Sequence, residues 1–517
     1  MLAWLAASLL DACALRAVHH AEGTPVRGAI HVNTTWSAAR SPYVMTHDVT
    51  VDGGVTLVIE PGVTVLANDG VRLTVEGRLL AEGTAEQHIR FTRNAGARSW
   101  TAIDFGPGPD ESRLAYVDME HAGSGGAPNL SANGTALALD HVVWRDTTSQ
   151  LLHLLDTSVI LRHSVLPTIR DHEPIRFTGM PAGGHAIIEG NTFGTTTGYN
   201  DIIDFTGGKR PGPIGQFLDN VFTGGADDVL DLDGTDAHIE GNVFMHVHQD
   251  AVRRSSSNAI ATGRKEKRSS DVTICRNIFY DCDHVVLLKG GATAVLQNNT
   301  IVGIAANPLA SEPPAVINFA EHRHPGGRSA IVDGNIVWDV AGNEMALNFD
   351  RATMTLQVYH TIFPTTLAGG IGNVSSDPLF VSVDHVTDVR EAFRLRPGSP
   401  AIGTGPNGLD MGALVPAGAS ISGEPASPTD RTEAVLRIGG PGIVAFRYRV
   451  NDGPYSAETP IADLLAGETV RLSNLRDGRY TVYVVGKNSA GVYQGLDTPT
   501  VSRTWTVRHR PRGRRRA

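Results

Sequence analysis

The sequence has little of what several common protein classes require. Its 517 residues include only three cysteines, Cys13, Cys275 and Cys282, which excludes a scaffold held together by disulfides. No apolar run is long enough to span a bilayer as a helix. Helical hydrophobic periodicity is also missing, and aromatic residues make up only 6%. The 57 glycines instead indicate a β protein rich in turns.

Positive charge is scarce in the body of the chain. The formal net charge is −10 although six arginines lie within the last ten residues. An acidic body argues against nucleic acid as the main partner, but it is compatible with bound cations.

A short repeat organises the sequence. An Asn followed by two apolar or β-branched residues recurs at Asn191, Asn220, Asn242, Asn277, Asn299 and Asn335, with similar trios at His141, His163 and His360. The successive steps are 22, 28, 29, 22, 35, 22, 36 and 25 residues, which indicates a unit of 22 with insertions. Such a unit suits one coil of a parallel β-helix, in which coils stack about 4.8 Å apart. We expect the recurring Asn to take a left-handed backbone and to bond the Asn of the next coil.

The composition divides the chain into five parts. We expect a leader or disordered segment at 1–25, a parallel β-helix at 26–416, a linker at 417–432, a β-sandwich at 433–507 and a basic tail at 508–517. Thr35–Thr50 is predicted to cap the first coil, because an open solenoid end would template aggregation. Cys275 and Cys282 fall within one coil, where they either pair or remain unpaired and buried.

The repeat region resembles the right-handed parallel β-helix repeat proteins of bacteria, in the pectate-lyase-like superfamily. The resemblance rests on the entry segment Gly54–Thr84 and on three exit segments, Asp377–Phe380, Phe393–Gly405 and Asp410–Ala413. It implies an all-β fold, a right-handed single-stranded solenoid followed by a small sandwich. Glu433–Val507 looks like a fibronectin-type or immunoglobulin-like module. The resemblance also implies an extracellular or cell-surface protein, although the apolar N-terminus lacks a basic start. We expect a monomer.

Acidic residues recur at one position of successive coils. Aligning the strands that follow each trio gives one column of Glu173, Asp201, Asp228, Asp250 and His284. A second column, three residues on, contains Arg176, Asp204, Asp231, Arg253 and Leu287. Carboxylates one strand spacing apart repel one another, so they call for a shared proton, a basic neighbour or a cation. Oxygen-rich sites suit Ca²⁺, and no Cys/His spacing suggests zinc. His246 and His248 share one strand face, either as functional groups or as surface residues.

The resemblance to pectate, alginate and chondroitin lyases implies a Ca²⁺-assisted polysaccharide lyase acting on an acidic polysaccharide. By this analogy Asp201, Asp228, Asp231 and Asp250 hold the ion. The catalytic groups are drawn from Lys289, Arg253, Arg254, Asp228 and His248. Substrate binding falls to Glu173, Arg176, Asp204, Lys209 and His246.

Two alternatives remain open. Asp227 and Asp228 resemble the paired aspartates of polygalacturonase-type hydrolases, although the Gly-His-Gly and Arg-Ile-Lys motifs of those enzymes are missing. The other alternative is a protein without catalysis that binds glycans or has a structural role, since Asp at turns is common in solenoids. Ser255–Ser270 is expected to form a basic loop whose charges guide an anionic chain, namely Arg264, Lys265, Lys267 and Arg268.

Overall fold

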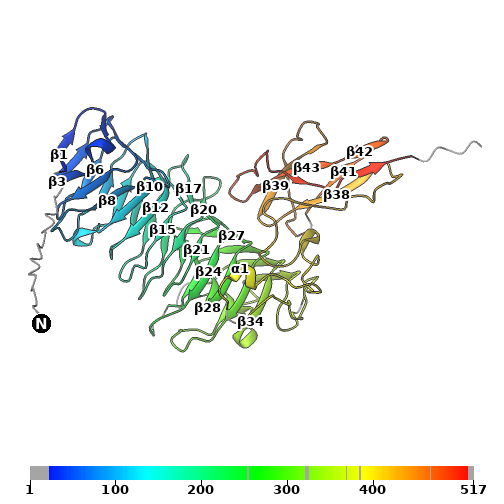
Figure 1. Ribbon diagram of the computed structural model, residues 1–517. Helices are drawn as coiled ribbons and strands as arrows, with labels where there is room; N and C mark the ends of the chain where they lie inside the picture. The colour runs from blue at the N-terminus through cyan, green and yellow to red at the C-terminus, as the bar shows by residue number, and fades with distance from the viewer. Residues whose placement is uncertain are drawn as a thin grey trace, which may run out of the picture.

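The computed structural model describes residues 23–252, 255–320, 325–367, 369–383, 386–465 and 467–509. Most of the predicted leader, with Cys13, and most of the basic tail lie outside these ranges. The described chain forms a parallel β-solenoid of about 12 turns, followed by small antiparallel sheets (Figure 1). The predicted all-β fold is therefore confirmed. In the described ranges, no helix is long and apolar enough to cross a membrane.

Each central coil contributes a strand to three parallel sheets. The first sheet contains β13 (Leu152–Leu155), β16 (Ile175–Thr178), β19 (Ile203–Thr206), β22 (Leu230–Asp233), β25 (Asn258–Lys265), β29 (His284–Leu288) and β32 (Ala315–Asn318). The second contains β14 (Ser158–Arg162), β17 (Ala186–Glu189), β20 (Gly215–Leu218), β23 (Ala237–Glu240), β27 (Asp271–Cys275), β30 (Thr293–Gln297), β33 (Ser329–Asp333) and β36 (Thr355–Tyr359). The third contains β15 (Val165–Leu166), β18 (Thr192–Phe193), β21 (Val221–Phe222), β24 (Val243–Val247), β28 (Ile278–Cys282), β31 (Thr300–Ile304) and β34 (Ile336–Val340).

The solenoid interior is filled by rows of identical or similar side chains. Strand alternation sends every second residue inward. In the third sheet this row is a stack of four phenylalanines, with ring centroids 4.7, 4.9 and 4.9 Å apart along Phe193, Phe222, Phe244 and Phe279. Each ring therefore packs at the coil spacing, and the row acts as a continuous apolar spine.

A buried asparagine ladder runs beside the phenylalanine spine. The Asn242 Oδ1 accepts hydrogen bonds from the backbone N–H and the Nδ2 of Asn220, each at 2.9 Å. The same pattern repeats at Asn191, Asn277, Asn299 and Asn335. The expected bonding between coils is confirmed.

The left-handed backbone lies one residue earlier than expected. Positive φ angles belong to His163, Gly190, Asp219 and Gly241, each of which directly precedes a ladder residue. In the coil of His163 the ladder residue is Ser164, one position later than predicted. The Ser164 Oγ accepts a hydrogen bond from the Val142 N–H, and the Ser164 N–H donates to the side chain of Asn191. The side chain of the ladder residue must point into the solenoid to make these hydrogen bonds. The left-handed backbone of the turn therefore belongs to the preceding residue.

The predicted basic loop is a strand. Residues 255–270 contain β25, which pairs with β22 and β29, and β26 (Arg268–Ser269), which folds back on β25 as a hairpin. Ala259, Ile260 and Ala261 are buried, which explains the wrong prediction: the apolar half of the segment fills the first sheet. Only the charged half reaches solvent as a hairpin tip.

From residue 23, where the described chain begins, the N-terminal end is made of coil strands. Strand β1 (Thr24–Ile30) pairs in parallel with β3 (Tyr43–Val51), and β2 (Thr34–Trp36) pairs with β4 (Thr56–Ile59). Thr35–Thr50, expected to be a cap, thus supplies ordinary coil strands.

The C-terminal part of the predicted solenoid folds back along its outside. Residues 377–415, which we call the strap, include the short helix α1 (Val389–Ala392). The strap packs Phe393, Met411 and Ala413 on the outward-facing row of the third sheet. That row contains Val243, Ile278 and Ile336, each nearly inaccessible, whereas Val165, which the strap does not contact, is 45% exposed. The strap explains why both residues that follow Asn242, Asn277 and Asn335 are apolar: one faces the solenoid interior and the other faces the strap.

A separate core forms the C-terminal module. Its antiparallel sheets contain β37 (Ser420–Ser422), β38 (Ala434–Gly439) and β41 (Glu468–Leu472), then β39 (Ile443–Val450), β40 (Thr459–Pro460), β43 (Val482–Asn488) and β44 (Thr500–Val501), and finally β42 (Gly478–Tyr480) with β45 (Trp505–Val507). These sheets are consistent with a β-sandwich. Strand β37 lies inside the segment expected to be a linker.

The module lies beside the C-terminal half of the solenoid (Figure 1). The Ser489 carbonyl accepts from the Arg210 guanidinium, the Ser489 Oγ lies 2.9 Å from His238, and the Gly442 N–H donates to Gln297. These contacts join the module to β23, to β30 and to the segment that precedes β20.

Candidate functional site

The first acidic column is present, but one of its five members differs from the prediction. Strand register aligns Ile175 with Ile203, Leu230, Ile260 and Val286, which places Glu173, Asp201, Asp228 and His284 at one position as predicted. Asn258, and not Asp250, occupies the fourth place, because it pairs directly with His284. Asp250 is exposed in the preceding turn and accepts from the Gly198 N–H at 2.8 Å.

Two carboxylates of this column meet the neighbouring Asp227 at one corner of the solenoid. Oxygens of Asp201, Asp227 and Asp228 all lie within 4.8 Å of one another; we call this group the carboxylate corner. The Asp228 N–H donates to Asp201, and the Asn258 Nδ2 donates to the Asp228 Oδ1 at 2.8 Å. Burial, and then the charge of Asp228, raise the pKa of Asp201 well above its usual range.

The second column departs from the prediction at the same coil. Asp204 pairs with Asp231, and Asp231 pairs with Ala261 in the place expected for Arg253. The Arg176 guanidinium lies 3.6 Å from Asp204 and 4.0 Å from Glu173. Burial raises the pKa of Asp231 well above its usual range, as do the nearby Asp233 and Asp228.

Of the Lys and Arg groups predicted for catalysis, Lys289 is the one within the described residues, and it does not lie at the carboxylate corner. Lys289 lies 4.0 Å from Asp233 and aligns with Gly263, five residues beyond Asn258. That offset corresponds to about 16 Å along a strand. Lys209, which was predicted to bind substrate, binds Asp236 and the Ser269 carbonyl, at 2.5 and 2.6 Å. Arg253 and Arg254 lie outside the described residues.

Gly263 makes room for the pair of Lys289 with Asp233. A Cβ at Gly263 would lie 2.0 Å from the Asp233 Oδ1 and 3.1 Å from the Lys289 Cε. The missing side chain lets the two charged groups meet across an intervening coil, so this pair has a structural role.

His246 and His248 belong to a chain of histidines and carboxylates. The Nδ1 of His246 lies 2.7 Å from Asp281, and His248 bridges Asp281 and Asp283 at 3.1 and 2.8 Å. Hydrogen bonds to Asp281 and then Asp283 raise the pKa of His248 to about 9. The hydrogen bond from His248 lowers the pKa of Asp281 to about 2. At neutral pH His248 is therefore a cation held between two anions.

This ion pairing predicts a pH-dependent stability. The pKa of His248 is higher in the folded protein, so its contribution is fully present below pH 6.5 and is lost as the pH rises through about 9. We expect His248→Gln to lower the free energy of unfolding at pH 6 by about 1–2 kcal/mol, because the side chain is one-third exposed. Thermal melts from pH 6 to 10 should show wild type approaching the variant at the alkaline end. A constant gap would contradict this assignment.

Two further histidine clusters escaped the sequence analysis. His238 lies 2.9 Å from Glu240 and close to Cys275. Arg276 and Ser489 bind this group and Gly442 covers it, so it serves the contact with the module. Cys275 and Cys282 are both buried and unpaired. The other cluster contains Asp140, His141 and His163. Its two histidines are 22 residues apart, the length of one coil, and that spacing was the available signal.

No protein-family model matches the chain, and no similar sequence was found among curated proteins.

Proposed function

We propose that the protein binds an acidic polysaccharide outside the cell, through a Ca²⁺ ion held at the carboxylate corner. The observation that carries this proposal is the meeting of Asp201, Asp227 and Asp228 oxygens within 4.8 Å. A uronate carboxylate would complete the coordination of such an ion, and a repeating polymer could follow the repeating coils.

The donor set fits a hard cation. Ca²⁺ takes six to eight oxygen ligands in flexible geometry, and the corner offers three carboxylates. The buried Oδ1 of Asn258, next in the column, has no hydrogen-bond partner among the described residues. A cation would also relieve the repulsion that keeps the Asp201 pKa high.

Exposed groups near the corner suit a sugar polymer. Tyr199 is 69% exposed and lies two residues before Asp201, where its ring offers an apolar face to a sugar. On the outer face of the first sheet, Arg176 offers a guanidinium for a carboxylate.

Glycoside hydrolysis is a second candidate, favoured by the raised pKa of Asp201. A buried carboxyl group with a raised pKa can donate a proton to a leaving oxygen, while an ionised neighbour acts as nucleophile or base. The short carboxylate separation is nearer to that of retaining enzymes, about 5 Å, than to the wider spacing of inverting ones. For lyase chemistry, Lys289 lies too far from the corner to act as the base, so Arg253 or Arg254 would have to take that role.

Calorimetric titration with Ca²⁺ tests the main proposal. We expect Asp201→Asn and Asp228→Asn to weaken binding at least about 10-fold. Asp250→Asn is the matched control, because Asp250 lies in the same region but outside the corner, and it should bind like wild type. Pectate, alginate and glycosaminoglycans should then bind in Ca²⁺ and be released by chelator. Equal Ca²⁺ affinity in wild type and Asp201→Asn would overturn the proposal.

Product assays separate binding from catalysis. New reducing ends without ultraviolet absorbance would establish hydrolysis, and absorbance from an unsaturated uronate would establish a lyase. Binding without either product would leave a glycan-binding protein.

The variant Asp201→Asn also has an expected effect on stability. Because the pKa of Asp201 is raised in the folded state, ionisation of Asp201 opposes folding as the pH rises above 3.8. In chelator at pH 7, Asp201→Asn should therefore be more stable than wild type by about 1–3 kcal/mol, and the gap should shrink toward pH 4. Saturating Ca²⁺ should stabilise only wild type. Melts in chelator and in Ca²⁺ check both parts; a less stable variant in chelator contradicts the first.

A further inference from the structure

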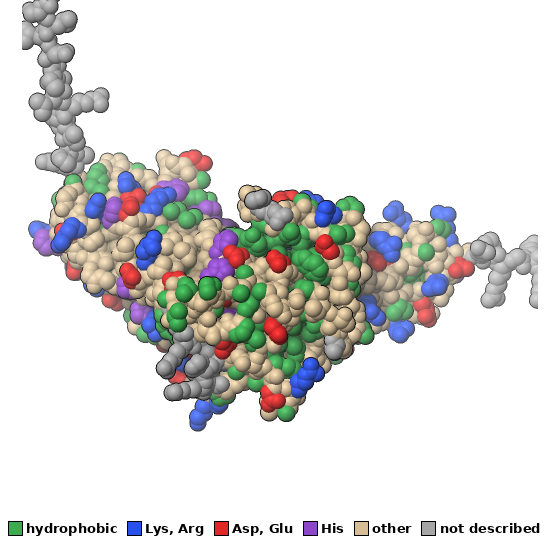
Figure 2. Space-filling model, turned by 90° about the horizontal axis from the view of Figure 1, so that it is seen from below, with side chains coloured by type: hydrophobic (Ala, Val, Ile, Leu, Met, Phe, Trp, Pro, Cys, Tyr) green, Lys and Arg blue, Asp and Glu red, His purple; other side chains and the backbone are tan. Residues whose placement is uncertain are grey.

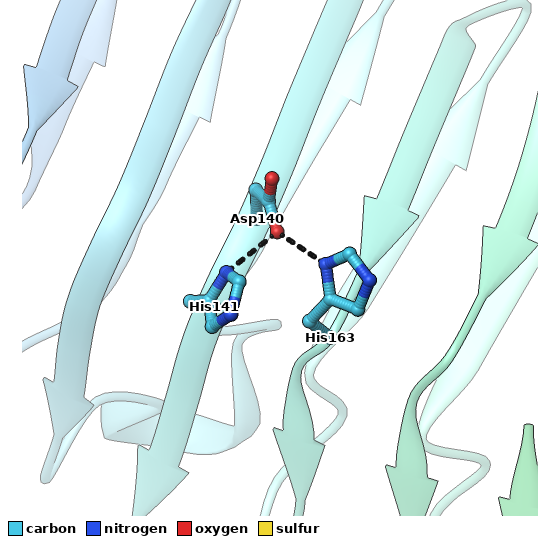
Figure 3. Close-up of side chains that lie close together, drawn as sticks. All are labelled: Asp140, His141 and His163. Atoms are coloured by element: carbon cyan, nitrogen blue, oxygen red, sulfur yellow. Dashed lines mark hydrogen bonds and ion pairs between the residues drawn. The ribbon is translucent and has the colours of Figure 1, made fainter. Parts of the chain in front are cut away.

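Histidines are visible over the N-terminal half of the face in Figure 2. His141 and His163 lie on adjacent coils and point toward Asp140 (Figure 3). Asp140 and His141 belong to β12 (Ala136–Arg145), and His163 follows β14. This group is separate from the carboxylate corner in sequence and in donor chemistry.

The coil geometry brings the two imidazoles together. Val143 pairs with Val165, which places His141 directly beside His163. Both residues have left-handed backbones, with φ of 55° and 47°, so both rings leave the sheet at the same turn. Their centroids are 4.9 Å apart. On the other side, the ring of Tyr116 stacks on His141 at 4.3 Å.

The next coil leaves space for the His163 ring. A Cβ at Gly190 would lie 3.0 Å from the His163 Cδ2, which is tighter than ordinary contact. Tyr116 on one side and Gly190 on the other thus hold the histidine pair in a defined slot.

The three donor atoms converge on one point. The Nδ1 atoms of His141 and His163 lie 2.8 and 2.9 Å from the same oxygen, Oδ1 of Asp140. All three candidate ligand atoms lie within 4.8 Å of one another. The side chains are 39%, 50% and 44% exposed for His141, His163 and Asp140, so an ion could enter and keep an open coordination position.

We propose that Asp140, His141 and His163 form a binding site for a divalent transition-metal ion of the zinc or copper class. Two imidazoles and one carboxylate are donors that suit such ions, and three protein ligands leave a fourth position for water or a partner group. The nitrogen donors distinguish this site from the all-oxygen carboxylate corner, which suits Ca²⁺. The inference does not depend on the proposed function.

Titration of tag-free, full-length protein with Co²⁺ and Zn²⁺ tests the site. Co²⁺ should produce visible absorption bands typical of low coordination number, and Zn²⁺ should displace it. His141→Gln, His163→Gln and Asp140→Asn should each weaken Zn²⁺ binding by about 10-fold or more. Excess Ca²⁺ should leave the Co²⁺ spectrum unchanged.

Two control variants keep the result specific. His88 pairs with Asp118 and lies outside the cluster. The variant His88→Gln should therefore bind Zn²⁺ like wild type. His246→Gln tests the competing cluster of His246, His248 and Asp281. Loss of the Co²⁺ spectrum in His246→Gln with retention in His163→Gln would overturn the assignment, as would no binding by folded wild type.

Discussion

Asn242→Ala is expected to lower the free energy of unfolding of the solenoid by about 3–5 kcal/mol. The side chain is fully buried, accepts two hydrogen bonds from Asn220, and donates to Asn277 and the Phe217 carbonyl. Alanine removes these partners and admits no water to replace them. Each buried polar group left unpaired costs about 1–3 kcal/mol. Chemical denaturation followed with hydrogen exchange should show the loss centred on β20–β28.

Asn373→Ala provides the comparison at the end of the ladder. Asn373 accepts from the Thr361 N–H and donates to Val358, but it is only partly buried. Water can replace its bonds, so we expect a loss of about 1 kcal/mol or less. Equal losses for Asn242→Ala and Asn373→Ala would show that the ladder contributes little beyond local turns.

Phe244→Ala should cost about 3–5 kcal/mol through a different mechanism. The ring is completely buried between Phe222 and Phe279, with both centroids 4.9 Å away. The coils are held at their spacing by backbone pairing, so the cavity cannot collapse along the stack. Phe244→Leu should lose less than half as much, because most of the volume remains.

Hydrogen exchange also checks the Phe244 prediction. In a solenoid each coil contacts only its neighbours, so instability should spread to adjacent coils before distant ones. Protection should fall first in β21, β24 and β28, while the N-terminal coils stay protected. A uniform loss over all coils would contradict this nearest-neighbour behaviour.

The repeat unit and most of the first column could be predicted because they depend on local pattern. The Asn trios mark the same place in each coil, and Glu173, Asp201, Asp228 and His284 lie at similar distances after them. The prediction failed where the turn length changed. Asp250 follows Asn242 at the usual offset, but the longer turn moves Asn258 into the strand.

Contacts between distant segments could not be predicted from coil pattern. The strap segments were interpreted as the last coils, because Phe393 and Met411 look like core residues wherever they pack. A signal for the strap was nevertheless present: two successive apolar residues in a strand face opposite sides. Val243 and Ile278 therefore needed an external cover. The 22-residue spacing placed His141 and His163 at one coil position, but it did not show that both rings turn toward Asp140.

The strap also determines how mechanical tension would pass through the molecule. Arg390 donates to the Gly241 carbonyl and Arg276 donates to the Val415 carbonyl, so the returning chain is fastened to middle coils. The C-terminal module is fixed beside them through Arg210 and Gln297. A force applied at the C-terminal end therefore reaches β20–β30 first.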